Sequence, residues 1–308
     1  LNSAKENPDK TALNYMNIKV KYKTLLKRIE ALSASFYHMG LRKGDIVLVL
    51  LPNVPQAVYA LYALNRIGAV PAFASPLSAE AEIEMYLAKT KADVIIAIDS
   101  LREKLQSVFV RTGAKKLVIT SIFDEFKFFD IPPKADEIPF AKICKNKSKG
   151  SIYLNSPRSH DTAVILFSGG TTGTPKAVEL TNLNLNALAQ GTEEACGYNV
   201  RGVRMLSVLP VFHGFGLGIG IHTALIGGAT CILIPQFSVK VYADTLVKQK
   251  PNLIPGVPTL FEALLRAENL EGVDLSFLKG IFSGGDSLSV ELKKKVDAFL
   301  KAHNCTEQ

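Results

Sequence analysis

The chain has few cysteines, and none of them has the spacing of a metal site or a redox pair. Four cysteines occur in 308 residues, far apart and with no Cys-x-x-Cys pair, at Cys144, Cys196, Cys231 and Cys305. Neither a zinc site nor a disulfide framework is indicated. This usage fits a reducing compartment, and we expect a cytoplasmic protein.

Several catalytic signatures are also missing. No Gly-x-Ser-x-Gly elbow is present, since Ile281 stands two residues before Ser283, and no histidine pair has the spacing of a zinc protease. Glycine occupies every second position from Gly214 to Gly220, which cannot produce the Gly-x-Gly-x-x-Gly of dinucleotide-binding folds because isoleucine takes the last place. Hydrolase, metalloenzyme and dinucleotide-binding functions therefore lack support.

One long stretch lacks charge. No Asp, Glu, Lys or Arg occurs from Met205 to Val239, and residues 214–234 alone are long enough to cross a bilayer. Prolines bracket the stretch, two histidines lie inside it, and its glycines form two clusters. We expect buried strands and a buried helix near 217–226 rather than a transmembrane segment. The polar first ten residues predict no signal peptide, and peripheral membrane contact stays open.

Positive charge is in excess but dispersed. The formal net charge is +8, which raises nucleic acid or an anionic membrane as partners. The densest run, Lys142 to Lys149, has no interleaved aromatic residues and is more typical of a solvated loop. We expect no nucleic-acid partner.

Buried strands and amphipathic helices alternate along the chain. This rhythm predicts an α/β protein with parallel sheets covered on both faces. Residues 121–158, rich in Pro, Lys and Ser, predict an irregular connection. We therefore expect two parallel-sheet subdomains, 1–158 and 159–308. The expected strands are 46–50, 94–98, 117–120, 163–167, 205–209, 230–234, 252–255 and 280–283, and the expected helices are 22–38, 56–67, 79–89, 101–110, 183–196, 241–250, 259–266 and 290–302.

The most informative segment follows the strand at 163–167. It reads Ser168-Gly169-Gly170-Thr171-Thr172-Gly173-Thr174-Pro175-Lys176. Glycines let backbone N–H groups converge on an anion, threonine hydroxyls add donors, and the lysine adds a positive charge. A Walker A loop would need Gly-Lys-Ser/Thr at the start of a helix, but here Pro175 precedes the lysine and Ala177 follows it. The segment predicts a phosphate-binding loop of another kind.

This loop resembles the phosphate signature of the adenylate-forming, AMP-binding superfamily, with Gly169 in place of a serine and Ala177 in place of a glycine. Three later segments resemble further family motifs in the family's order, at 209–216, 256–260 and 282–289. The likeness is closest to bacterial fatty acyl-CoA synthetases. It implies the N-terminal portion of their large α/β domain.

The resemblance also implies site residues. The ATP phosphates would be held by Ser168, Gly169, Gly170, Thr171, Thr172, Gly173 and Lys176. Adenine would lie against Gly284, Gly285 and Asp286. The acid would be bound by His213, Phe215, Gly216, Val257, Thr259 and Ser283. The implied cofactors and co-substrates are ATP, Mg²⁺ and coenzyme A.

The family's later motifs do not occur in these residues. The Tyr-Gly-x-Thr-Glu motif that contacts adenine and magnesium, the ribose aspartate and the catalytic lysine are absent from the sequence. The resemblance thus implies a fragment, inactive by itself, of a ligase that adenylates a medium- or long-chain fatty acid and transfers the acyl group to CoA. We assign no catalytic residue and no metal ligand within it. An aryl-acid CoA ligase and a catalytically silent nucleotide-binding module are the alternatives.

Overall fold

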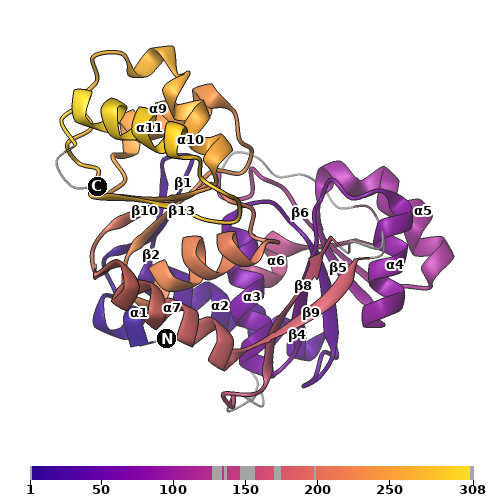
Figure 1. Cartoon of the computed structure of the whole chain (residues 1–308). Coiled ribbons are helices and arrows are strands. Elements are labelled where there is room, and N and C mark those ends of the chain that lie inside the picture. Colours follow the sequence, from indigo (N-terminus) through magenta and orange to yellow (C-terminus); the bar gives the residue numbers. More distant parts are fainter. Residues whose placement is uncertain are drawn as a thin grey trace. The chain divides into compact units, whose positions relative to one another are not determined.

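The protein is described by a computed structural model that covers residues 2–126, 134, 137–145, 157–169, 175–197 and 199–305. The chain divides into two compact units. One, here called the loop unit, comprises Lys23–Ala187 with Val211–His213. The other, here called the groove unit, comprises Leu1–Tyr22, Leu188–Pro210 and Gly214–Gln308. Figure 1 labels many of their helices and strands.

The loop unit is built on a seven-stranded sheet in the order β7-β6-β5-β3-β4-β8-β9. Its strands are parallel except β9, which returns antiparallel to β8. The strands are β3 (Ile46–Leu50), β4 (Val70–Phe73), β5 (Val94–Ile98), β6 (Lys116–Thr120), β7 (Glu137–Pro139), β8 (Thr162–Ser168) and β9 (Lys176–Thr181).

Helices cover both faces of this sheet. They are α2 (Tyr22–His38), α3 (Pro55–Ile67), α4 (Glu80–Thr90), the 3₁₀ turn η1 (Asp99–Leu101), α5 (Arg102–Thr112) and α6 (Phe140–Lys145). Alternate strand residues such as Leu48 and Ile95 pack against Ile83 of α4 and Leu105 of α5. Figure 1 shows α2, α3 and α6 on the opposite side of the sheet from α4 and α5. The central strands are apolar on both faces for this reason.

Local chemistry sets the ends of helix α3. Pro55 fits the first helical turn because its missing N–H has no partner to lose there. Gly68 follows the helix with φ of 80°, a left-handed conformation that glycine adopts without strain. The Gly68 N–H reaches back to the carbonyl of Asn65, which ends the helix.

The groove unit has a six-stranded sheet in the order β13-β12-β10-β11-β1-β2. All neighbours are parallel except β1 and β2. Its strands are β1 (Thr11–Tyr15), β2 (Ile18–Lys21), β10 (Arg204–Ser207), β11 (Thr230–Leu233), β12 (Leu253–Gly256) and β13 (Gly280–Ser283). Strand β1 joins this sheet by pairing Leu13 with Cys231, far away in the sequence.

One face of this sheet holds the main core of the groove unit. Tyr242 of α9, Phe261 of α10 and Leu300 of α11 pack there against strand residues that include Ile232 and Ile254. The helices of the unit are α1 (Asn2–Glu6), the π-helix η2 (Gly216–Thr223), α8 (Ala224–Ile226), α9 (Val239–Gln249), α10 (Pro258–Leu265), the 3₁₀ turn η3 (Glu268–Leu270) and α11 (Val290–Ala302). Helix α7 (Asn182–Cys196) begins in the loop unit and ends in the groove unit.

The expected fold class is confirmed, since both sheets are mostly parallel and carry helices. The unit boundaries differ from the expected division at 158/159. Strands β1 and β2 belong to the groove unit, and β8 and β9 complete the sheet of the loop unit. Strand β7 and helix α6 also lie inside the stretch 121–158 that was expected to be irregular. Strand pairing between distant segments decided these assignments.

Helix α11 begins with a side-chain cap. The Ser289 hydroxyl accepts a hydrogen bond from the Leu292 N–H at 3.1 Å. We expect Ser289→Ala to lower the free energy of unfolding by about 1 kcal/mol, because one N–H of the first turn loses its partner. Urea denaturation followed by circular dichroism measures the change. Ser287→Ala, just outside the helix, is the control, and an equal loss in both variants would contradict the cap.

Candidate functional site

The loop 169–175, here called the phosphate loop because phosphate binding is predicted for it, joins two antiparallel strands of the loop unit. Strand β8 ends at Ser168, strand β9 begins at Lys176, and these two residues are register partners. Both are exposed. The lysine is therefore the first residue of the strand that follows the loop. The described chain after the loop enters strand β9 rather than a helix, which separates it from the Walker A loop by geometry as well as by sequence.

Part of the predicted phosphate site lies outside the described residues. Gly170, Thr171, Thr172 and Gly173 fall in the range 170–174, which the structure does not describe. Gly169 is exposed, and a Cβ added there would meet no heavy atom within 4 Å. Its backbone has no steric need for glycine, so the serine that the family usually has would fit at this position.

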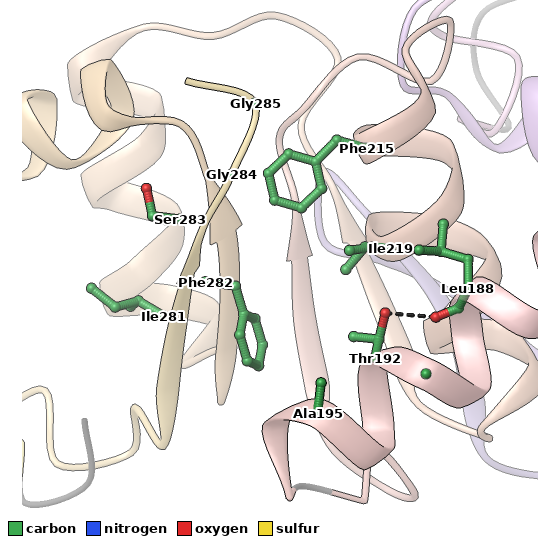
Figure 2. A pocket seen from close by; sticks show the side chains of 11 residues that line it. Leu188, Thr192, Ala195, Phe215, Ile219, Ile281, Phe282, Ser283, Gly284 and Gly285 are labelled. Atoms are coloured by element: carbon green, nitrogen blue, oxygen red, sulfur yellow. Dashed lines mark hydrogen bonds between the residues drawn. The ribbon is translucent and has the colours of Figure 1, made fainter. Parts of the chain in front are cut away.

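An open groove of about 640 Å³ lies in the groove unit. Three elements line it: the last turns of α7, the π-helix η2 with the residue before it, and the end of β13 (Figure 2). The walls are largely apolar, with two hydroxyl side chains. The lining residues are Leu188, Gly191, Thr192, Ala195, Phe215, Ile219, Ile281, Phe282, Ser283, Gly284 and Gly285.

The predicted Gly-Gly segment forms one end of the groove. A Cβ at Gly284 would come within 3.0 Å of the Phe215 ring, and Gly285 has φ of 78°, which disfavours other residues. Figure 2 shows the Phe215 ring beside these two glycines. Glycine at 284 thus leaves room for the Phe215 ring, and glycine at 285 permits the positive φ of the segment after β13.

The structure brings some predicted site residues together and leaves others apart. Phe215, Ser283, Gly284 and Gly285 line the groove. Val257 does not line the groove but lies beside Gly285, since its Cγ1 would be 3.4 Å from a Cβ added at that glycine. The remaining predicted residues of the groove unit, Gly216, Thr259 and Asp286, do not line the groove, and His213 is an exposed residue of the loop unit.

Gly216 has a packing role. A Cβ at this residue would lie 2.2 Å from the Pro210 carbonyl oxygen and 2.5 Å from that of Leu209. The start of η2 thus lies directly against the chain that leaves β10. The glycine permits that approach, and its neighbour Phe215 supplies the groove surface.

Sequence reasoning missed the contribution of helix α7. Leu188, Gly191, Thr192 and Ala195 follow the spacing i, i+3, i+4 and i+7, which places them on one helical face. That spacing could have indicated a shared helical face, but three of the four residues are small or polar, so the face has no apolar pattern. Leu185 and Ala189, on the adjacent side of the helix, are buried and hold it in place.

The glycine-rich stretch 216–223 forms a helix with wide turns. The Thr223 hydroxyl donates to the Gly218 carbonyl, five residues back, at 2.9 Å, and the Ser207 hydroxyl of β10 donates to the Gly220 carbonyl. Wide π turns in helices are frequent at functional sites because they displace side chains from regular helical positions. A helix was expected near 217–226. It is present and starts earlier in the chain.

His222 of η2 is buried, and burial lowers its pKa to about 4. Between about pH 6.5 and pH 4, the His222 imidazole is therefore protonated in the unfolded chain but neutral in the folded chain. We expect the free energy of unfolding to fall as the pH falls from about 6.5 toward 4, by about 2 kcal/mol at pH 5. Urea titrations across this range measure it.

The His222 prediction has a matched control. His222→Gln should remove most of the pH dependence, whereas the exposed His160→Gln should keep it. An identical pH slope in the original protein and in His222→Gln would contradict the assignment.

The described residues contain neither a cluster of metal-ligating side chains nor a membrane-spanning helix. Within the ranges given above, no three His, Cys, Asp or Glu side chains converge to hold a metal ion. Among the described helices, none combines the length and the apolar character needed to cross a bilayer.

Comparison with known proteins identifies the family. The family model described as AMP-binding enzyme matches residues 2–306. The chain belongs to this family. A long-chain-fatty-acid–CoA ligase of Bacillus subtilis (strain 168) is 33% identical over 96% of this chain and 56% of its own length. A 4-coumarate–CoA ligase 1 of Solanum tuberosum is 27% identical over 84% of this chain and 46% of its own length.

Solved structures have the same fold. A long-chain-fatty-acid–CoA ligase from Archaeoglobus fulgidus superimposes with a TM-score of 0.84 at 23% identity, covering 99% of this chain and 60% of its own. The anthranilate CoA ligase AuaEII, solved with anthranoyl-AMP, gives 0.83 at 20% identity over 97% of this chain and 56% of its own. The chain thus spans about half the length of the curated relatives named here.

Proposed function

We propose that this chain is part of an ATP-dependent ligase that adenylates a medium- or long-chain fatty acid and passes the acyl group to coenzyme A. The observation that carries the proposal is the apolar groove that ends at Gly284 and Gly285. The family match over residues 2–306 supports ATP use, and the Bacillus subtilis relative supports a fatty acid and CoA.

The proposed reaction has two steps. A carboxylate oxygen attacks the α-phosphorus of ATP, the bond to the bridging oxygen breaks, and pyrophosphate leaves. The CoA thiol sulfur then attacks the acyl carbon, and AMP leaves. Two anions must approach each other in the first step, so neutralising charge is the main electrostatic requirement.

In this proposal the phosphate loop holds the β- and γ-phosphates. Backbone N–H groups of Gly169, Gly170 and Gly173 and the hydroxyls of Ser168, Thr171 and Thr172 donate hydrogen bonds, and Lys176 supplies a positive charge. The position of Lys176 supports this role because it is exposed and lies opposite Ser168 where β9 begins. Adenine lies near Gly284, Gly285 and Asp286, where the first two allow a close backbone approach.

The acid is assigned to the groove. Its volume of about 640 Å³ is within the range of small-molecule sites, roughly 300–1,000 Å³. Leu188, Ile219, Ile281 and Phe282 offer the aliphatic and aromatic surface that an acyl chain buries. His213, Gly216, Val257 and Thr259 complete the proposed acid-binding set by resemblance to the family. The rings of Phe215 and Phe282 also suit an aryl acid, which the 4-coumarate relative favours.

Magnesium is part of the proposal as the ion that accompanies ATP and neutralises phosphate charge. No cluster of three metal-ligating side chains occurs among the described residues. Magnesium is usually bound through substrate phosphates with one or two carboxylates, and in this proposal the phosphates of ATP would hold it.

The test is carboxylate-dependent exchange of labelled pyrophosphate into ATP by the complete protein. Acetate, decanoate, palmitate and 4-coumarate are compared, and CoA thioester formation is measured with the best acid. We expect exchange with decanoate or palmitate. Exchange with 4-coumarate alone would establish the aryl-acid ligase. If ATP binds but no acid supports exchange, the silent nucleotide-binding module is favoured.

The 308 residues taken alone are proposed to be inactive in thioester formation, since the family's catalytic lysine motif is not among them. The same thioester assay on this chain checks this. Robust turnover by it would contradict the fragment interpretation.

A further inference from the structure

Helix α7 carries a glycine in its interior that neither backbone conformation nor packing explains. Gly191 lies within Asn182–Cys196 and is not among the residues with positive φ. A Cβ built there would meet no heavy atom within 4 Å. Glycine in a helix interior destabilises the helix relative to alanine, so this position forgoes stability without a local structural reason.

Other glycines of the groove unit show the contrast. A Cβ at Gly216 would collide with backbone oxygens, and one at Gly218 would lie 2.5 Å from Leu188 Cδ2. At Gly216 the obstacles are backbone atoms, so η2 needs glycine there, whereas at Gly218 a Cβ would require the Leu188 side chain to move. The open space in front of Gly191 is the groove itself, which this residue lines.

The side chains that α7 contributes to the groove are larger at Leu188 than at positions 191 and 195. Leu188 packs against Gly218 of η2, which closes the space between the two helices at that level. One turn later, position 191 has no side chain, and position 195 has only a methyl group. Figure 2 shows the Phe282 ring extending from β13 across the groove from Thr192 and Ala195.

We infer that Gly191 sets the width of the acyl groove and thereby admits long unbranched acyl chains between α7 and Phe282. The inference rests on the proposed function, because it takes the groove as the acid site. A side chain at position 191 would project into the groove and occupy space that the distal part of a long chain needs. A short acid, which ends before this level, would be unaffected.

The first test is direct binding, which needs no catalysis. The 308-residue chain is titrated with cis-parinaric acid, a fluorescent unbranched fatty acid, and the probe is then displaced with palmitate. Gly191→Leu should weaken binding by about tenfold or more, since added methylene groups in a filled apolar site have effects of this size. Gly191→Ala should give a smaller loss.

The control variant is Gln190→Leu, which places a leucine side chain at the neighbouring position. That position is exposed and does not line the groove. This variant should bind the probe as the original protein does. Thermal unfolding of Gly191→Leu should occur at the same or a higher temperature, which excludes misfolding as the cause of weaker binding. Equal binding by the original protein and Gly191→Leu would overturn the inference.

The second test separates this inference from the proposed function. In the complete protein, Gly191→Leu should lower the ratio of palmitate to acetate in pyrophosphate exchange by about tenfold. An unchanged ratio would overturn the inference while leaving the ligase intact. If no acid supports exchange but Gly191→Leu still loses the fatty acid probe, the ligase fails and the groove assignment stands.

Discussion

Replacing Lys176 with alanine in the complete protein is expected to slow acid-dependent pyrophosphate exchange by about 100-fold, the usual effect of removing one group that stabilises developing charge. Lys176 is the first residue of strand β9 and lies opposite Ser168, the last residue of β8, so the two residues flank the phosphate loop. In the proposed reaction its ammonium faces the pyrophosphate, which gains negative charge as it leaves. Loss of this group therefore raises the barrier of the first step.

The Lys176 experiment needs two comparisons. Lys176→Arg keeps the charge and should retain more activity than alanine, although the planar guanidinium cannot reproduce a compact ammonium. Lys19→Ala removes an exposed strand lysine from β2 and should leave exchange unchanged. Exchange that is unaffected in Lys176→Ala would count against the assigned role of the loop.

Gly216→Ala is expected to lower the free energy of unfolding by about 3 kcal/mol, the upper end of typical overpacking costs. The new methyl carbon would start 2.2 Å from the Pro210 carbonyl oxygen and 2.5 Å from that of Leu209. Both obstacles are backbone atoms, which cannot rotate away as a side chain can. Either η2 or the chain after β10 must shift, and the groove shifts with it because Phe215 precedes the glycine.

The same substitution at Gly191 is the matched control. Gly191→Ala meets no atom and should stabilise helix α7 by about 0.5–1 kcal/mol. Urea unfolding of both variants under one set of conditions measures the two effects. A Gly216→Ala protein as stable as the original would show that η2 can move away from the Leu209–Pro210 backbone without loss.

Local patterns predicted most elements well. Helix α2 and strands β3, β5 and β13 have the expected bounds, because buried runs and helical spacing are properties of a few neighbouring residues. Strand β4 was missed because Pro71 lies inside it, and proline usually argues against a strand. Strand β9 was missed because its residues are mostly exposed and carry little apolar pattern.

Strand partners could not be predicted in the same way. Strand β1 resembles any short apolar strand, and nothing near it indicates that Leu13 pairs with Cys231. Strand β8 could equally have joined the sheet of the residues that follow it, but it pairs with β4. Such choices depend on how large apolar surfaces fit together, and this fit is a property of the whole unit.

Residue types alone were enough to predict the chemical character of the phosphate loop, its difference from a Walker A loop and the family that the family match confirms. These properties depend on residue types within a few positions, where backbone freedom, hydroxyls and charge act locally. Only the tertiary structure decided which sheet each strand joins and that α7, η2 and β13 share one groove. The reason is that a groove is the space left when distant elements pack, and no short segment of sequence specifies that space.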